Sequence, residues 1–181
     1  MNQFIIVIDG PIASGKTTVA KLLHAKLKRT AHVSLDRIKH LISDYKPTDK
    51  DKTLATQIAA GMIKEYLKHG ISVIVENAFI QSKYVERFVK LENRKRGKNA
   101  VAVFVYQIEV PLHIGIKRAK KREQKTNPLK KISITRIKRN HTRYKIYRYT
   151  KPTRVFQSDK LSAKQIAREI LRKVATGKKS I

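Results

Sequence analysis

FIIVIDGPIASGKTTVAKLLHAKL, residues 4–27, is the stretch that decides how this 181-residue chain folds. It opens with a continuous apolar, β-branched run, Phe4–Ile8, which is typical of a central strand covered on both faces of a parallel sheet. It closes with leucines and a valine at helical spacing and lysines on the opposite side. Between the two, residues 10–17 complete the pattern G-x-x-x-x-G-K-[ST]. The stretch therefore predicts a strand, a phosphate-binding loop (P-loop) and a helix, in that order.

The P-loop carries the strongest chemical signal in the sequence. Its glycines let the backbone wrap a polyphosphate, with amide N–H groups turned toward it at the positive end of the following helix. Lys16 is expected to reach the terminal phosphates, and the Thr17 hydroxyl is expected to bind Mg²⁺. ATP and Mg²⁺ are therefore the expected cofactors. The expected nucleotide contacts come from Gly10, Ala13, Ser14, Gly15, Lys16, Thr17 and Thr18.

The rest of the chain alternates short apolar runs with helical patterns. One of these helices is marked by Leu54, Ile58, Met62 and Leu67 and is expected to end at Gly70. Further strands are predicted at 32–35, 71–75, 101–108 and 154–157. This order indicates an α/β fold, a three-layer sandwich around a five-stranded parallel sheet. We expect a single domain over residues 1–176, followed by a flexible tail at 177–181.

Composition excludes several classes of protein. The chain has no cysteine, which rules out a thiol nucleophile, a thiolate zinc site, an iron–sulfur cluster and a disulfide framework. Its apolar runs are far shorter than the ~20 residues that a membrane helix needs. The N-terminus lacks the basic region and cleavage site of a secretion signal. These features predict a cytoplasmic protein without a membrane partner.

The charge is unusually positive. Lys and Arg number 42 against 13 Asp and Glu, which gives a formal net charge of +29. Residues 111–154 hold 16 of the basic residues and one acid, Glu123, so this window contributes +15. A polyanion is therefore an expected partner, in particular a nucleic acid bound through residues 117–154, which we call the basic segment. The alternative is that lysine is abundant on every surface of the protein for reasons unrelated to binding.

Polar side chains are expected at the carboxyl ends of two strands, where α/β sheets bind ligands. Asp36 follows the second strand and is the expected general base, because a hydroxyl acceptor must lose its proton while it attacks phosphorus. Its alternative role is to cap the next helix. Glu76 and Asn77 follow the third strand; they could support the Mg²⁺ water shell, touch the acceptor, or only cap the chain.

A basic helical pattern after Pro111 is the expected lid, at about residues 115–131. Arg118 and Arg122 lie four residues apart and so on one face of it, where two guanidinium groups could stabilise the charge of the transferring phosphate. Further along, Tyr144, Tyr147 and Tyr149 are interleaved with Lys and Arg, a pattern suited to stacking nucleic-acid bases. Packing into the core is the alternative for some of them. The six histidines show no metal-ligand spacing.

The segments GPIASGKTT, VSLDRI, ISVIVENA, IKRAKKRE and RVFQSDKLSAKQIAREIL together resemble the small P-loop kinases of the adenylate-kinase-like group. The nearest resemblance is to the kinase domain of polynucleotide 5′-hydroxyl kinases, with zeta-toxin and chloramphenicol phosphotransferase relatives nearby. It implies Lys16 and Thr17 at the ATP phosphates and Mg²⁺, Asp36 as general base, Arg118 and Arg122 in the lid, and residues 154–158 near the adenine. The sequence departs from that family at Lys39, where an Arg is usual, and at Glu76, where an Asp is expected.

Three functions are consistent with the sequence. The leading hypothesis is an ATP- and Mg²⁺-dependent kinase of a hydroxyl group, with the 5′-hydroxyl of a nucleic acid as the favoured acceptor. The second is a kinase of a nucleotide, nucleoside, sugar or other small metabolite. The third is a nucleic-acid-binding protein that ATP switches on or off. The sequence does not choose the acceptor.

Overall fold

The central sheet is the predicted one. The computed structural model describes residues 3–79, 81–92, 101–123 and 133–177, with only the backbone of Arg122 and Glu123. Five strands pair in parallel in the order β2-β3-β1-β4-β5. The first strand lies at the centre, because Phe4–Ile8 is apolar on both faces and is buried on both. The strands are β1 (Gln3–Asp9), β2 (Thr30–Ser34), β3 (Ser72–Glu76), β4 (Val101–Glu109) and β5 (Arg154–Gln157).

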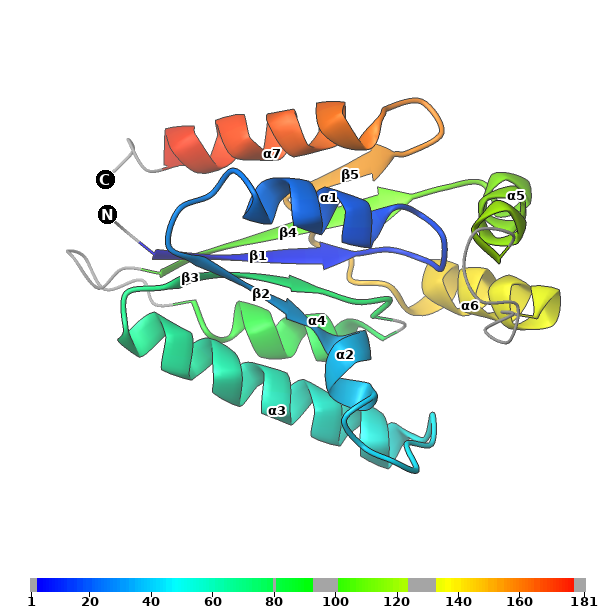
Figure 1. The fold of residues 1–181 in the computed structure, drawn as a ribbon, viewed down its shortest axis with the longest axis horizontal. Coiled ribbons are helices and arrows are strands. Elements are labelled where there is room, and N and C mark those ends of the chain that lie inside the picture. Colours follow the sequence, from blue (N-terminus) through cyan, green and yellow to red (C-terminus); the bar gives the residue numbers. More distant parts are fainter. Residues whose placement is uncertain (1–2, 80, 93–100, 124–132, 178–181) are drawn as a thin grey trace.

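Helices cover both faces of the sheet and complete the three layers (Figure 1). One face packs against α1 (Lys16–His24) and α7 (Ala163–Gly177), whose inward apolar side chains meet the alternate residues of β1, β3 and β4. The other face packs against α3 (Asp49–Lys68) and α4 (Ser82–Val89). None of the described helices is long and apolar enough to span a membrane.

Of the four apolar residues that mark α3 in the sequence, only Leu67 packs against the core. Leu54, Ile58 and Met62 are 44%, 40% and 39% exposed, whereas Ala55, Ala59 and Ile63 are buried against the sheet. The two stripes are one residue apart, a rotation of about 100° around the helix. The larger side chains mark the helix in the sequence, but the stripe that contains two alanines faces inward, which lets the helix backbone approach the sheet closely.

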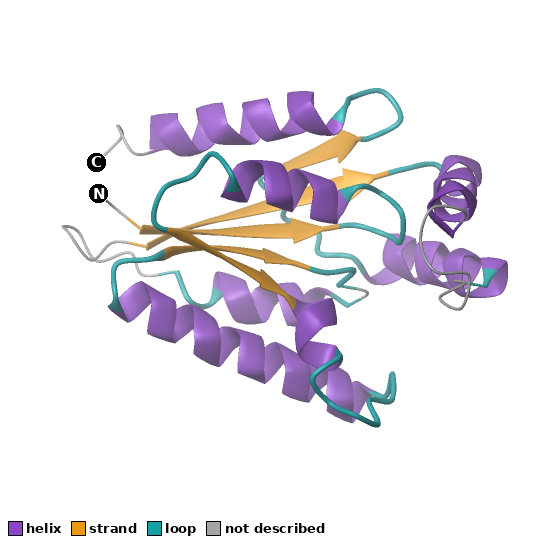
Figure 2. Ribbon diagram, in the orientation of Figure 1, coloured by secondary structure: helices purple, strands orange, loops and turns teal. Residues whose placement is uncertain are grey.

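Three more helices lie at the edge of the sheet where the strands end. The short α2 (Leu35–Lys39) follows β2 directly, and α5 (Leu112–Glu123) and α6 (Ile134–Tyr147) lie side by side beyond the carboxyl ends of the strands (Figure 2). The predicted lid falls on α5 and on residues 124–131, which lie outside the described part of the chain, as does the end of the predicted tail at 178–181. This edge of the sheet therefore gathers the P-loop, α2 and the two described helices of the basic segment, α5 and α6.

Candidate active site

The P-loop connects β1 to α1 through an unusual backbone path. Gly10 has φ 151°, and a Cβ at this position would lie 2.1 Å from the Ile108 carbonyl oxygen of β4. Ala13 has φ 63° and Gly15 has φ 96°, so three residues of the loop adopt positive φ. Strain at a non-glycine residue such as Ala13 is typical of functional loops that the surrounding structure holds in place. The loop therefore has the curved path that the motif predicts.

Lys16 is folded into the loop. Its ammonium Nζ donates to the Pro11 carbonyl oxygen at 2.7 Å, and the same oxygen accepts from Ser14 N–H at 3.3 Å. The Lys16 side chain is buried. A lysine held this way lies where it can exchange a backbone carbonyl for the phosphate oxygens of a bound nucleotide.

Asp9, the residue before the loop, is a buried carboxylate that the sequence analysis did not single out. Its Oδ1 accepts from Gly10 N–H at 2.7 Å and from Phe79 N–H at 2.9 Å. Burial raises the pKa of Asp9 to about 7, against the lowering effect of these two hydrogen bonds and of the Lys16 charge. Asp9 thus ties the start of the P-loop to the segment that follows β3.

Thr17 and Glu76 form the part of the site suited to a metal ion. The Thr17 hydroxyl donates to Glu76 Oε2 at 3.2 Å, and the Ser34 hydroxyl donates to Glu76 Oε1 at 2.8 Å. Glu76 is buried at the end of β3. In the described part of the chain, no group of three or more His, Asp or Glu side chains could hold a metal by itself. This donor set fits Mg²⁺, which is usually bound through one or two protein oxygens together with substrate phosphates and waters.

Asp36 lies one residue further from the end of β2 than predicted, because the strand ends earlier. The second strand ends at Ser34, which takes the N-cap position, so Asp36 lies in the first turn of α2 and does not cap it. Lys39 donates to Asp36 Oδ1 at 3.1 Å and to Asn77 Oδ1 at 3.2 Å. Partial desolvation raises the pKa of Asp36, but the Lys39 and Lys16 ammonium groups outweigh it and hold the pKa below its ordinary value. The Asp36 carboxylate is therefore ionised at neutral pH and 69% exposed.

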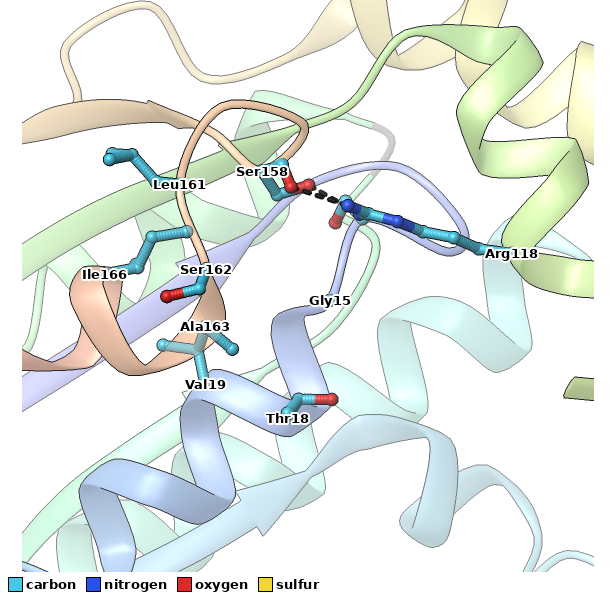
Figure 3. A pocket seen from close by; sticks show the side chains of 10 residues that line it. Gly15, Thr18, Val19, Arg118, Ser158, Leu161, Ser162, Ala163 and Ile166 are labelled. Carbon is cyan, nitrogen blue, oxygen red and sulfur yellow. Dashed lines mark hydrogen bonds between the residues drawn. The ribbon is translucent and has the colours of Figure 1, made fainter. Parts of the chain in front are cut away.

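A pocket of about 240 Å³ lies between the P-loop side of α1 and the loop that joins β5 to α7 (Figure 3). Arg118 reaches it from α5 and donates to the Ser158 hydroxyl at 2.8 Å and to the Ser158 carbonyl oxygen at 2.6 Å. The pocket combines an apolar wall with a few hydroxyl groups, as small-molecule sites usually do. Its lining consists of Ser14, Gly15, Thr18, Val19, Arg118, Ser158, Leu161, Ser162, Ala163 and Ile166.

The loop that forms this pocket is held by the predicted capping box of α7. Ser162 N–H donates to Gln165 Oε1 at 2.9 Å, and Gln165 N–H donates to Ser162 Oγ at 3.3 Å. Of residues 154–158, for which the resemblance implied a place near the adenine, Ser158 lines the pocket and Arg154 pairs with Glu169 at 2.6 Å. Arg122, the second predicted lid residue, lies in the last turn of α5, and its side chain is outside the described part of the chain.

The inner face of α6 contacts the P-loop, a feature that the sequence analysis missed. Asn140 Oδ1 accepts from Ile12 N–H at 2.7 Å, and His141 Nε2 lies 3.0 Å from the Ile12 carbonyl oxygen. One turn later Tyr144 is buried beside Asp9, so its predicted alternative, core packing, is correct. Tyr147 is 50% exposed. The partners of Asn140 and His141 lie more than 120 residues earlier in the chain, so no local pattern reveals these contacts.

Comparison with known proteins agrees with this geometry. Residues 5–145 match a family model described as AAA domain, and this span includes the P-loop, Asp36, Glu76 and most of α6. The chain belongs to this family. No curated protein matches the sequence.

Solved structures with the same fold include kinases. A chain of the Pnkp1/Rnl/Hen1 RNA repair complex aligns with TM-score 0.65 and 16% identity over 84% of this chain, which spans about half (49%) of that longer chain. A sugar kinase from Janibacter sp. HTCC2649 aligns with TM-score 0.67 and 16% identity, covering 95% of this chain and 94% of that one. The APS kinase CysC of Mycobacterium tuberculosis, solved with AMPPNP and APS, aligns with TM-score 0.67 and 17% identity, covering 94% and 96%. This family member therefore has a kinase-like P-loop fold.

Proposed function

We propose that this protein is an ATP- and Mg²⁺-dependent kinase that transfers the γ-phosphate of ATP to a hydroxyl group. The observation that carries the proposal is the juxtaposition of a complete P-loop with the ionised carboxylate of Asp36 at one edge of the sheet. The two groups supply what phosphoryl transfer from a nucleoside triphosphate needs, a cradle for the phosphates and a proton acceptor.

The donor nucleotide would occupy the pocket and the P-loop together. The base and ribose would lie in the pocket that Arg118 and the β5–α7 loop line together, and the phosphates would run along the amide N–H groups of the P-loop. Lys16 would leave the Pro11 carbonyl oxygen and bind the terminal phosphates. Thr17, with Glu76 behind it, would hold Mg²⁺, which neutralises charge on the phosphates when bound.

The transfer step follows from the position of Asp36. The acceptor hydroxyl oxygen would form a bond to the γ-phosphorus while the bond from phosphorus to the bridging oxygen of ADP breaks. The hydroxyl proton would pass to Asp36, whose carboxylate Lys39 keeps ionised and oriented. Arg118 and Arg122 on α5 are proposed to close over the nucleotide, with Arg118 on its base and ribose side.

We favour the 5′-hydroxyl of a nucleic acid as acceptor because α6, a strongly basic helix, lies at the same edge of the sheet as Asp36 (Figure 1). Arg136 and Arg139 on α6 are exposed. Tyr45, in the segment after α2, is close enough to both Asp36 and Arg136 for their charges to act on it. A polyanion that follows α6 would therefore lead toward the proposed general base. The Pnkp1 neighbour, whose structure is described as part of an RNA repair complex, supports this choice.

A small metabolite is the second candidate for the acceptor. The sugar kinase and the APS kinase align over nearly their whole length and over nearly all of this chain. In that case the basic segment would be a general surface property rather than a binding site.

Incubation of the protein with γ-labelled ATP, Mg²⁺ and a panel of acceptors tests the proposal. The panel contains 5′-hydroxyl DNA and RNA oligonucleotides, nucleosides, nucleotides and sugars. We expect label on the 5′ end of an oligonucleotide. Label on a small molecule alone would support the second candidate. Tight oligonucleotide binding that responds to ATP without any labelled product would support a nucleic-acid-binding switch and contradict the kinase.

Salt dependence of oligonucleotide binding tests the role of the basic segment. Arg136, Arg139 and Arg143 lie on one face of α6, and each phosphate contact should contribute about −0.7 to the slope of log affinity against log salt for single strands. Changing all three to Gln should flatten the slope by about two units. The same change at Lys164, Arg168 and Arg172, exposed on α7, is the matched control and should leave the slope unchanged. If the slope of log affinity against log salt is the same in the α6 variant and the α7 variant, nucleic-acid binding through α6 is contradicted.

A further inference from the structure

We infer that Asn140 and His141 of α6 are positioning residues for the P-loop, which orient its backbone toward the terminal phosphate of the bound nucleotide. This inference rests on the proposed nucleotide site but not on the identity of the acceptor. Its basis is that two side chains of a helix more than 120 residues away hydrogen-bond to one loop residue, Ile12. One bonds to its backbone N–H and the other to its carbonyl oxygen.

The first contact fixes the peptide between Pro11 and Ile12. In a trans peptide the C=O and the N–H point in opposite directions. Ile12 N–H is directed to Asn140 Oδ1, at 2.7 Å, so the Pro11 carbonyl must point to the other side. It does: the Pro11 oxygen accepts from Lys16 Nζ and from Ser14 N–H, both inside the loop. Asn140 therefore lies outside the loop, and the concave side of the loop is the side away from α6.

The second contact fixes the next peptide, between Ile12 and Ala13. The Ile12 carbonyl oxygen can only accept, so His141 Nε2 carries the proton and donates to it at 3.0 Å. By the same geometry Ala13 N–H points away from α6, toward the concave side of the loop. Ala13 has φ 63°, a conformation that alanine rarely adopts unless its surroundings impose it. His141 is therefore placed to impose the orientation that directs Ala13 N–H at a ligand.

The ligand group that Ala13 would meet is the terminal phosphate. The pocket proposed for the base and ribose lies against Ser14, Gly15 and Thr18, in the second half of the loop and the start of α1. Residues 10–13 of the loop do not line that pocket, and Lys16, which is proposed to bind the terminal phosphates, is bonded to Pro11 in this half of the loop. An N–H group aimed there contacts a triphosphate more fully than a diphosphate.

Helix α5 packs against the His141 side chain and helps to hold it in place. Gly115 packs so tightly on the imidazole that a Cβ at this position would lie 3.1 Å from both Cε1 and Nε2 of His141. A methyl group at position 115 would therefore press on the atom that donates to Ile12. The contact links α5, which carries Arg118, to the P-loop through one side chain.

The test compares the affinities of a non-hydrolysable ATP analogue and of ADP, each with Mg²⁺, by calorimetry on the full chain. His141→Leu removes the donor and should lower the affinity for the triphosphate about tenfold relative to ADP, the usual effect of one hydrogen bond to a charged group. His141→Gln keeps an N–H donor near the same place and should restore most of this preference. Thr142→Leu, the same substitution type at the exposed neighbouring position, is the matched control.

Gly115→Ala provides a second variant with the His141 side chain intact. It should lower the triphosphate preference by roughly twofold to threefold, because the neighbour must shift by only a few tenths of an ångström. Gly61→Ala, in a helix where the added Cβ meets nothing within 4 Å, is its control.

The outcomes separate this inference from the proposed function. An unchanged ratio of the two affinities in His141→Leu and in Gly115→Ala would overturn the inference. The inference would also be overturned if the affinities for the ATP analogue and for ADP fell equally and the melting temperature fell with them. His141 would then have only a structural role. A wild-type protein that binds neither nucleotide would instead overturn the proposed nucleotide site.

Discussion

The P-loop and the Asp36 region lie at the same edge of the sheet but are built in different ways. Asp9 and Lys16 are buried and bonded to backbone groups of the loop and its neighbours. The Asp36 side chain is 69% exposed, and its carboxylate accepts a hydrogen bond from Lys39. The proposed donor side is therefore held in place by hydrogen bonds within the protein, whereas the proposed acceptor side is open to solvent and offers few fixed contacts. Such a division lets one fold phosphorylate different acceptors.

The largest expected effect is on the donor side. Lys16→Ala should lower phosphoryl transfer roughly 10³-fold or more, because the variant lacks the charge that stabilises the transferring phosphate. The fold should persist, since Lys16 bonds to the loop rather than to the core. Measurement of labelled product from γ-labelled ATP checks this, with Lys21→Ala, an exposed lysine of α1, as control. Transfer within tenfold of wild type in Lys16→Ala would exclude the P-loop as the donor site.

The second effect distinguishes the two carboxylates by pH. Asp9 has its pKa raised to about 7 by burial, so the stability linked to it is complete below pH 3.8 and is lost as pH rises through about 7. As pH rises from 5 to 8, the free energy of unfolding of wild type should therefore fall by about 2–3 kcal/mol relative to that of Asp9→Asn. Asp36 has a lowered pKa, so Asp36→Asn should show the opposite sign, with its loss largest above pH 4.

Urea unfolding at several pH values measures this difference. Asp44→Asn, at another exposed acid, is the control for the change of charge alone. If the free energy of unfolding of Asp9→Asn depends on pH in the same way as that of wild type, the raised pKa of Asp9 is contradicted.

The smallest expected effect concerns Arg118. A variant at this position distinguishes a role in binding the nucleoside from a role in stabilising the transferring phosphate. The Arg118 guanidinium lines the proposed nucleoside pocket and bonds to Ser158. Arg118→Ala should raise KM for ATP about three- to tenfold with little change in kcat, as the loss of one polar contact to the nucleoside would. Lys117→Ala, at the exposed neighbouring position, is the control. A fall in kcat at unchanged KM would instead assign Arg118 to the transferring phosphate, as the sequence analysis expected.

The sequence predicted the sheet and the P-loop because both depend on local signals. The buried run of β1, the glycines of the loop and the capping box at Ser162 each fix the backbone within a few residues. The position of Asp36 was one step off, because the pattern does not mark where β2 ends and α2 begins.

The contacts that the sequence could not predict are tertiary. The inward face of α3 depends on how closely the helix approaches the sheet, and the hydrophobic period fits Leu54 and Ala55 almost equally well. Asn140 and His141 look like ordinary polar residues of a basic helix. Only the packing of α6 against the P-loop gives them a role, through bonds to Ile12 that span more than 120 residues.

The proposed mechanism assigns ATP binding to the P-loop side and hydroxyl activation to Asp36. Asp36→Asn tests it most directly, when ATP affinity by calorimetry and transfer of label are measured on the same preparation, with Asp44→Asn as control. We predict that ATP affinity stays within about twofold of wild type while transfer falls by about 10² to 10⁴, because the variant keeps its size but lacks a proton acceptor. Transfer at the wild-type rate, or a loss of ATP affinity in parallel with transfer, would contradict it.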